Sequence, residues 1–249
     1  MEKYKIIVSY DGTNYQGWQV QPNQKSIADC LQNSFKKVFN KSISIVGASR
    51  TDSGVHAFGQ VSQFRTDLDI DSQTIISSWN NILPDDILIR SIEKVPDDFS
   101  VFHDVVQKTY YYHLYLSRPL PFFARYGWHY EFINSVDFEK FNKALQLYIG
   151  EHDFRSFCRL EDDRSSIRTI DSITLNKLSR FNAIQVVVKG KSFLRFQIRR
   201  MIGYALDVAR RTDLSIDYLK DILENPSPKQ ILLKAEAKGL CLKKIIYKK

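Results

Sequence analysis

The sequence predicts an α+β protein with a mostly antiparallel sheet. Apolar segments of strand length and amphipathic segments of helix length are mixed along the chain, without the strict alternation that gives a parallel sheet. Residues 173–178 and 183–189 are two such strand segments separated by a short polar stretch, which is typical of an antiparallel hairpin. A chain of 249 residues is long enough for one large domain or two small ones.

The first half of the chain contains four predicted strands and two predicted helices. Strands are expected over residues 4–10, 43–46, 61–64 and 87–92, and a turn over residues 84–86. A helix is expected over residues 72–82. Ser26 is the predicted N-cap of another helix, because apolar residues follow it at helical spacing: Ile27, Leu31, Phe35 and Val38.

A similar order of elements is predicted for the second half. A strand over residues 109–116 is followed by a helix that Ser135 caps and that extends to about residue 149. After the hairpin come helices over residues 193–211 and 214–223, and a closing strand over residues 240–247. A boundary near residues 102–107 divides the chain into an N-terminal half, 1–105, and a C-terminal half, 106–249.

Positive charge is concentrated in the last quarter of the chain. Residues 189–249 contain 15 Lys or Arg against 6 Asp or Glu, whereas the whole chain has a net charge of +8. The remaining residues are therefore close to neutral. A basic quarter on a neutral body indicates an anionic partner, nucleic acid first, although a solvated lysine-rich surface has the same composition.

The cysteine pattern and the N-terminus argue for a reducing compartment. The three cysteines, Cys30, Cys158 and Cys241, are widely spaced, so neither a disulfide framework nor a structural zinc site is expected. The N-terminal apolar run is soon interrupted by Asp11, and no signal peptide or membrane span is visible. A cytoplasmic location is therefore expected.

The segment Arg50-Thr51-Asp52-Ser53-Gly54-Val55-His56-Ala57 is the candidate functional segment. Thr, Asp, Ser and Gly together are turn formers, so the plain interpretation is a polar turn. The segment follows a predicted strand, and loops at strand ends often carry functional side chains. Arg50 stands two residues from Asp52, where it could reach that carboxylate or an incoming phosphate.

This segment resembles the motif of the TruA family of tRNA pseudouridine synthases, which usually reads Gly-Arg-Thr-Asp-Ala-Gly-Val-His-Ala. Six further segments resemble family blocks in the same order along the chain, so the resemblance covers essentially all of it. They are Tyr10-Asp11-Gly12-Thr13 with Gly17-Trp18-Gln19-Val20-Gln21-Pro22, Lys108-Thr109-Tyr110-Tyr111-Tyr112, the block from Gly150 to Cys158, Arg168-Thr169-Ile170, the block from Phe193 to Gly203, and Gly239-Leu240-Cys241-Leu242.

The resemblance implies an RNA-modifying enzyme of a particular fold. It implies two similar α+β halves around a central, mostly antiparallel sheet with a basic active-site cleft. The implied reaction converts uridine to pseudouridine at positions 38–40 of the tRNA anticodon arm. It also implies a homodimer that needs no cofactor and no metal. A relative that acts on another RNA is an alternative.

The resemblance assigns roles to individual residues. Asp52 would be the catalytic carboxylate, which either attacks C1′ of the ribose or removes a proton to give a glycal. Arg50 would contact the RNA backbone and hold the extruded nucleotide. Tyr110 matches the active-site tyrosine, whose ring can stack on uracil, and Leu240 would line the uracil pocket.

Arg199 can also be argued from helical geometry. In the predicted helix over 193–211 it lies about 120° from the centre of a polar stripe, next to the apolar face. The stripe consists of Gln197, Arg200, Tyr204, Asp207 and Arg211. A partly buried guanidinium requires an anionic partner unless it extends to solvent. The resemblance pairs Arg199 with the catalytic aspartate, and such a pair would keep Asp52 ionised.

Several features differ from the family or suggest other functions. Ser49 and Ser53 replace the usual Gly and Ala of the motif, and no proline occurs in residues 234–238, where the family often has one. Residues 189–196 partly resemble the aromatic strand of an RRM, but the apolar spacing there favours a helix. His56 and His152 have no second ligand at metal-binding spacing, so no metal site is expected.

Overall fold

The computed structural model describes residues 1–160, 165–230 and 233–248 and separates into two compact units. The first unit comprises Met1–Val106 and Cys241–Lys249, and the second comprises Gln107–Leu240. Both combine helices with mostly antiparallel strands, which confirms the predicted α+β class. The division expected at 105/106 assigns the closing strand to the second half, whereas its contacts assign Cys241–Lys249 to the first unit.

The sheet of the first unit has the strand order β4-β1-β3-β10. Strand β1 (Glu2–Tyr10) lies antiparallel to both β4 (Ile87–Lys94) and β3 (His56–Thr66). Strand β10 (Leu240–Tyr247) runs parallel to β3. The strand expected over residues 43–46 is reduced to β2 (Val46–Gly47), because only these two residues pair with β3.

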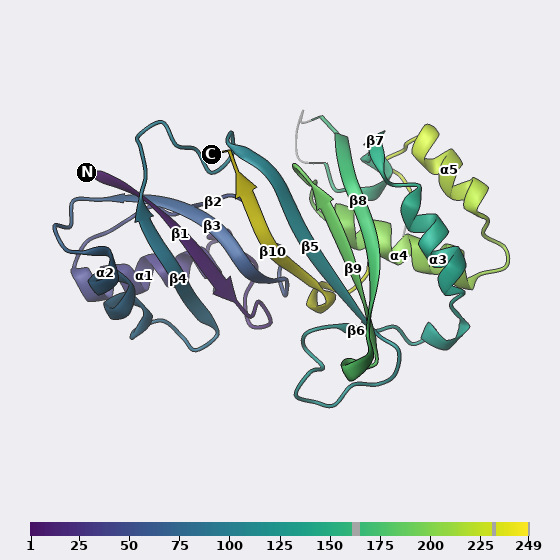
Figure 1. Cartoon of the computed structure of the whole chain (residues 1–249), viewed down its shortest axis with the longest axis horizontal. Helices are drawn as coiled ribbons and strands as arrows, with labels where there is room; N and C mark the ends of the chain where they lie inside the picture. Colours follow the sequence, from purple (N-terminus) through teal and green to yellow (C-terminus); the bar gives the residue numbers. More distant parts are fainter. Residues whose placement is uncertain (161–164, 231–232, 249) are drawn as a thin grey trace. The chain divides into compact units, whose positions relative to one another are not determined.

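Helices α1 (Ile27–Phe39) and α2 (Ser72–Asn80) lie together beside this sheet (Figure 1). The predicted N-cap is confirmed, since the hydroxyl of Ser26 accepts a hydrogen bond from the amide of Asp29. The ring of Phe35 meets Phe64 of β3 and Trp79 of α2 at centroid distances of 5.6 and 4.8 Å. These buried aromatic contacts join both helices to one face of the sheet.

The sheet of the second unit has the strand order β5-β9-β8-β7, with all three neighbouring pairs antiparallel. Its strands are β5 (Val105–Tyr115), β9 (Ala183–Gly190), β8 (Ile167–Leu178) and β7 (Gly150–Asp153), and the short β6 (Trp128–His129) runs parallel to β5. The predicted hairpin is confirmed as β8 and β9. It is longer than expected, because β8 begins six residues before position 173.

The two faces of this second sheet differ in character. Tyr110 and Tyr112 of β5 lie opposite Val188 and Val186, and all four side chains are buried. The intervening side chains, including Tyr111 and His113, point to the other face and are half-buried. The helices of this unit are α3 (Phe138–Gln146), α4 (Gln197–Arg210) and α5 (Ile216–Glu224). Figure 1 shows them together on the side of the sheet where β8 and β7 lie.

Two predicted helix starts are wrong, and both have a local cause. Helix α3 begins at Phe138, because the carboxylate of Asp137 accepts hydrogen bonds from the amides of Glu139 and Lys140; Ser135 instead ends the short 3-10 helix η1 (Ile133–Ser135). Helix α4 begins at Gln197 rather than at residue 193. Phe196 has a φ of +67°, a left-handed conformation that no right-handed helix includes.

The last predicted helix also starts slightly later than expected. Helix α5 begins at Ile216, because the hydroxyl of Ser215 caps it by accepting a hydrogen bond from the amide of Tyr218. Three more 3-10 turns are η2 (Arg155–Phe157), η3 (Ser179–Phe181) and η4 (Ala237–Gly239). Over the ranges that the structure describes, every helix is too short or too polar to cross a bilayer.

Candidate functional site

Asp52 lies in the loop of residues 48–55 that connects β2 to β3, here called the Asp52 loop. Asp52 itself is half-buried, and its neighbour Thr51 is buried. Arg50, on the other side of Thr51, is exposed. The loop therefore presents one carboxylate and one guanidinium two residues apart, with the residue between them anchored in the protein.

Backbone hydrogen bonds fix the Asp52 loop on both sides of the aspartate. The amide of Trp18 donates to the carbonyl of Thr51 at 3.1 Å, and the amide of Val55 donates to the carbonyl of Asp52 at 3.1 Å. The hydroxyls of Tyr10 and Thr51 are 2.7 Å apart. Because these partners come from β1 and from the connection between β1 and α1, the position of the Asp52 backbone is set before any substrate arrives.

Two glycines of the first N-terminal block make this close packing possible. Gly17 has a φ of +92°, and a β-carbon there would lie 2.5 Å from the carbonyl oxygen of Thr51. A β-carbon on Gly12 would overlap the backbone of Val55. The two motifs that resemble the family are thus in direct contact, and glycine is required where their backbones meet.

His56 connects the same two segments through its imidazole ring. The ring is buried, and its Nδ1 lies 3.1 Å from the amide nitrogen of Gly12 and 3.1 Å from a carboxylate oxygen of Asp11. The ring therefore contacts two neighbouring residues of the N-terminal block and joins them to the start of β3. Sequence reasoning treated His56 only as a possible metal ligand and missed this structural role.

Tyr110 occupies the buried face of β5 in the second unit. Its ring meets Phe193 edge to face at a centroid distance of 5.2 Å, and only 5% of the residue is exposed. Lys108, two residues earlier on the same face, is half-buried, and burial lowers the pKa of its amine to about 8. A basic group and an aromatic ring therefore share this end of the strand.

Arg199 is buried in α4, as its position on the predicted helix required, with an exposed fraction of 8%. Its Nε donates a hydrogen bond to the carbonyl oxygen of Ala235 at 2.8 Å. Its guanidinium carbon lies 5.6 Å from the ring centroid of Phe196. The predicted polar stripe is wrong, however: Gln197 and Tyr204 are buried, because the helix is enclosed on that side as well.

Leu240 follows η4 and is held next to the same segment as Arg199. The hydroxyl of Tyr112 donates to the carbonyl oxygen of Glu236 at 2.8 Å, and its ring fills the space where a side chain on Gly239 would lie. Burial raises the pKa of Tyr112, so its hydroxyl stays protonated. Sequence reasoning missed Tyr112, although its place two residues from Tyr110 on one face was visible in the strand pattern.

The structure thus forms two groups from the predicted residues. Arg50 and Asp52 lie in one loop of the first unit, and Tyr110, Arg199 and Leu240 belong to the second unit. Within the second unit, Arg199 and Leu240 both adjoin residues 235–240. The RRM alternative is excluded, because residues 191–196 form no strand and lead directly into α4.

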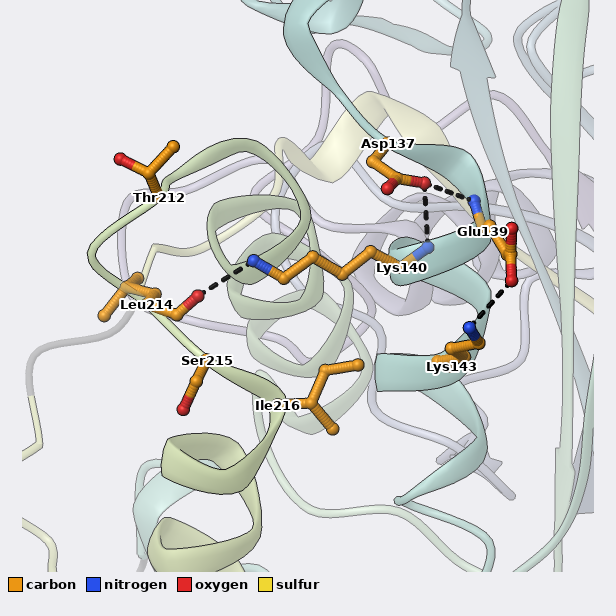
Figure 2. A pocket seen from close by; sticks show the side chains of 8 residues that line it. All are labelled: Asp137, Glu139, Lys140, Lys143, Thr212, Leu214, Ser215 and Ile216. Carbon is orange, nitrogen blue, oxygen red and sulfur yellow. Dashed lines mark hydrogen bonds and ion pairs between the residues drawn. The ribbon is translucent and has the colours of Figure 1, made fainter.

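A separate hollow of about 460 Å³ lies between the starts of α3 and α5 (Figure 2). Its charged residues are engaged with one another or with the backbone. The amine of Lys140 donates to the carbonyl of Leu214 at 2.9 Å, and Lys143 pairs with Glu139 at 2.7 Å. The hollow contains none of the predicted functional residues, and its contacts serve to join two helices.

Metal ligands do not cluster in the part of the chain that the structure describes. No three His, Cys, Asp or Glu side chains there gather into a group that could hold an ion. The chemistry of the described residues is instead that of one carboxylate, two guanidinium groups and aromatic rings.

Comparison with known proteins identifies the family. The family model described as tRNA pseudouridine synthase matches residues 6–104 and 144–248. Among solved structures, an H/ACA RNP bound to a substrate RNA containing 2′-deoxyuridine aligns over 95% of this chain and 68% of that chain, at 13% identity and a TM-score of 0.33. A likeness this low carries no conclusion about the fold.

Curated relatives match over the full length. The tRNA pseudouridine synthase A of Thermodesulfovibrio yellowstonii is 33% identical over 99% of this chain and 100% of its own length. The proteins of the same name from a Thermoanaerobacter species and from Brachyspira hyodysenteriae are 34% and 31% identical, over 99% and 100% of this chain and 100% and 99% of theirs. The chain therefore belongs to the tRNA pseudouridine synthase family, the TruA family that its motifs resemble, and it is an isomerase that forms pseudouridine in tRNA.

Proposed function

We propose that Asp52 is the catalytic carboxylate and that the target uridines lie at positions 38–40 of the tRNA anticodon arm. The observation that supports Asp52 is its loop. Hydrogen bonds at Thr51 and Asp52 hold the backbone, and the aspartate is half-exposed in the loop that leads into β3. A carboxylate held in this way is suited to act on a nucleotide that leaves its stack.

The reaction is an isomerisation, so its atoms balance without a co-reactant. The bond between N1 of uracil and C1′ of ribose breaks, and a bond between C5 and C1′ forms. The proton on C5 is lost, and N1 carries a proton in the product. Asp52 starts the sequence by attacking C1′ or by removing the C2′ proton. A substrate deuterated at C2′ separates the routes, because only the second breaks that bond.

The other four residues bind the substrate in this proposal. Arg50 is exposed and contacts the RNA backbone beside the target nucleotide. Tyr110 supplies an aromatic ring for the uracil, and Leu240 supplies an apolar wall. Arg199 supplies a buried positive charge, whose Nε is already fixed by Ala235. The reaction needs anion binding and base stacking, and these side chains provide both.

The test of the proposed carboxylate is Asp52→Asn. The change is nearly isosteric, so the fold and tRNA binding should persist, while the rate of pseudouridine formation falls at least about a thousandfold. Asp69→Asn is the matched control, because Asp69 is an exposed aspartate of the same unit. Activity of Asp52→Asn within about tenfold of the wild type would contradict the assignment.

The target positions need a separate measurement. The measurement maps pseudouridine across the tRNAs of cells that have the gene and of cells in which it is deleted. The pseudouridine signals at positions 38, 39 and 40 should disappear together in the deletion strain. Purified protein should restore them on an unmodified transcript. Loss confined to another tRNA position would contradict the proposed target and would leave the role of Asp52 standing.

We also propose a cytoplasmic homodimer, on the strength of the motifs that the chain shares with its family. Light scattering of the purified protein should give twice the chain mass of 29.1 kDa. A monomeric mass at working concentration would contradict the dimer. Cell fractionation should recover the protein with cytoplasmic tRNA, and recovery with membranes would contradict that location.

A further inference from the structure

We propose that an aromatic patch of the second unit binds unpaired nucleotides of the RNA substrate by stacking. The patch consists of Phe122, Phe123 and Tyr126, in the loop of residues 117–127 between β5 and β6, and of Phe181 in η3. None of these four belongs to the proposed catalytic or substrate-binding residues. The inference rests on the proposed function only in taking tRNA as the partner.

The four rings are far more exposed than aromatic side chains usually are. Phe122 is 81% exposed, and Phe123, Tyr126 and Phe181 are 40 to 45% exposed. Leu120, in the same loop, is 64% exposed. Exposed apolar side chains that occur together, rather than singly, mark a surface that a partner covers.

The backbone that carries these rings is held in place by the sheet. The hydroxyl of Tyr115 donates to the carbonyl of Phe123 at 2.8 Å, and Nδ1 of His113 lies 3.2 Å from the carbonyl of Tyr126. Gly127 packs directly against the ring of Tyr115. The loop therefore presents its rings from a fixed position, which reduces the entropy lost when a partner binds.

The η3 turn is joined to the loop by independent contacts. The amide of Leu116 donates to the carbonyl of Asn182 at 2.9 Å, and the side-chain amide of Asn182 donates to the hydroxyl of Ser117 at 2.8 Å. The rings of Phe123 and Phe181 meet edge to face at 5.4 Å. The two segments thus form one surface.

The charges around the patch favour an anionic partner. Arg118, Arg125 and Arg180 are exposed within the two segments. Residues 117–130 and 176–183 contain no Asp or Glu. Aromatic rings interleaved with arginines are the combination that binds single-stranded nucleic acid, because rings stack on bases while guanidinium groups contact phosphates.

A second copy of the chain fits the same surface less well. In a symmetric dimer centred on the patch, each arginine cluster would face its own counterpart across the two-fold axis. Neither of the two segments that form the patch contains an Asp or Glu that its counterpart could pair with across the axis. RNA supplies both the negative charge and the flat apolar faces that the surface lacks.

The patch lies beyond the end of β5, away from Tyr110 along the strand. The register of β5 with β9 is continuous from Lys108 to Tyr115. From Tyr110 to Tyr115 the strand therefore rises about 17 Å, at about 3.3 Å per residue. His113 and Tyr115, which anchor the loop, lie on the face of β5 opposite Tyr110, so the patch is a separate contact for the RNA rather than an extension of the uracil site.

Phe122→Ala tests the proposal, because Phe122 is the most exposed of the four rings. The dissociation constant for an unmodified tRNA transcript should rise about fivefold or more, the loss of one base–ring stack. Phe122→Trp retains a flat ring and should bind like the wild type. Phe102→Ala is the matched control, since Phe102 is an exposed phenylalanine of the first unit.

A fully paired RNA duplex and the molecular mass complete the experiment. The loss in Phe122→Ala should vanish on the duplex, where no unpaired base is available. An equal loss on duplex and tRNA, or no loss on tRNA, overturns the proposal. A fall in molecular mass by light scattering also overturns it, because the patch would then join two copies. Since binding is measured rather than turnover, failure of the catalytic assignment leaves this comparison unaffected.

Discussion

Gly17 illustrates how single residues determine the position of the proposed catalytic aspartate. Its φ of +92° is a conformation that only glycine adopts without strain. Its α-carbon also lies so close to the carbonyl of Thr51 that a β-carbon would not fit between them. The amide of the next residue, Trp18, bonds to that same carbonyl. One position therefore determines both the path of the N-terminal block and the placement of the residue before Asp52.

We expect Gly17→Ala to reduce activity as well as stability. The backbone conformation alone costs about 1–2 kcal/mol for a residue with a β-carbon, and the clash with Thr51 displaces the Asp52 loop. Thermal unfolding and the rate of pseudouridine formation measure the two effects.

Gly150→Ala is the control for that experiment. Gly150 has a φ of +105°, but a β-carbon there would have no neighbour closer than 3.7 Å. It should lose only the cost of the backbone conformation, about 1–2 kcal/mol and less than Gly17→Ala loses, and keep its activity. Equal losses of activity in both variants would show that the loop does not depend on Gly17.

The starts of helices show how elements are determined partly locally and partly by their surroundings. Helix α1 begins where its sequence predicts, because Ser26 accepts a hydrogen bond from Asp29 within the same turn. Helix α4 begins four residues after Phe193 because Phe196 adopts a left-handed conformation. The ring of Phe196 lies within 4.3 Å of the amine of Lys234 and 5.0 Å of the guanidinium carbon of Arg195, contacts that support this turn.

Removing the local signal at α1 should destabilise the protein by a predictable amount. Ser26→Ala deletes the capping oxygen and should lower the free energy of unfolding by about 1 kcal/mol. Ser42→Ala, at an exposed serine after the helix, should change it by less than about 0.5 kcal/mol. Denaturant titration compares the two, and equal effects would show that the cap contributes nothing.

The path of the chain through its two units is a property of the whole molecule. The chain leaves the first unit at Val106 and returns to it at Cys241, where β10 pairs in parallel with the start of β3. Cys241 lies opposite His56 in that register. The C-terminal strand therefore supports the strand that begins directly after the Asp52 loop, although the paired residues 241 and 56 are 185 positions apart.

The distribution of charge predicts how the whole protein binds tRNA. Residues 189–249 carry the positive excess. The logarithm of the binding constant should therefore fall linearly with the logarithm of the salt concentration, because counterions are released on binding. Lys191→Ala, in that basic quarter, should reduce the slope by about 1, the loss of one phosphate contact. Lys36→Ala, an exposed lysine of the neutral body, should leave it unchanged. The reverse result would contradict a basic C-terminal RNA contact.

The sequence by itself determined the α+β class, the hairpin of β8 and β9 and the capped start of α1. Each follows from hydrophobic periodicity or from a hydrogen bond within a few residues, so the local amino-acid sequence is sufficient to predict it. The seven colinear motifs also indicated the family before any geometry was known. The proposed roles of Asp52, Arg50, Tyr110, Arg199 and Leu240 come from those motifs and remain predictions.

Only the tertiary structure decided how those motifs contact one another. The close approach of Gly17 to Thr51, the bond from Gly12 to His56 and the parallel pairing of β10 with β3 join residues that lie far apart in the sequence. The burial of Gln197 and Tyr204 likewise depends on what encloses α4. Such contacts are set by the packing of whole elements and the loss of water between them, which local periodicity does not contain.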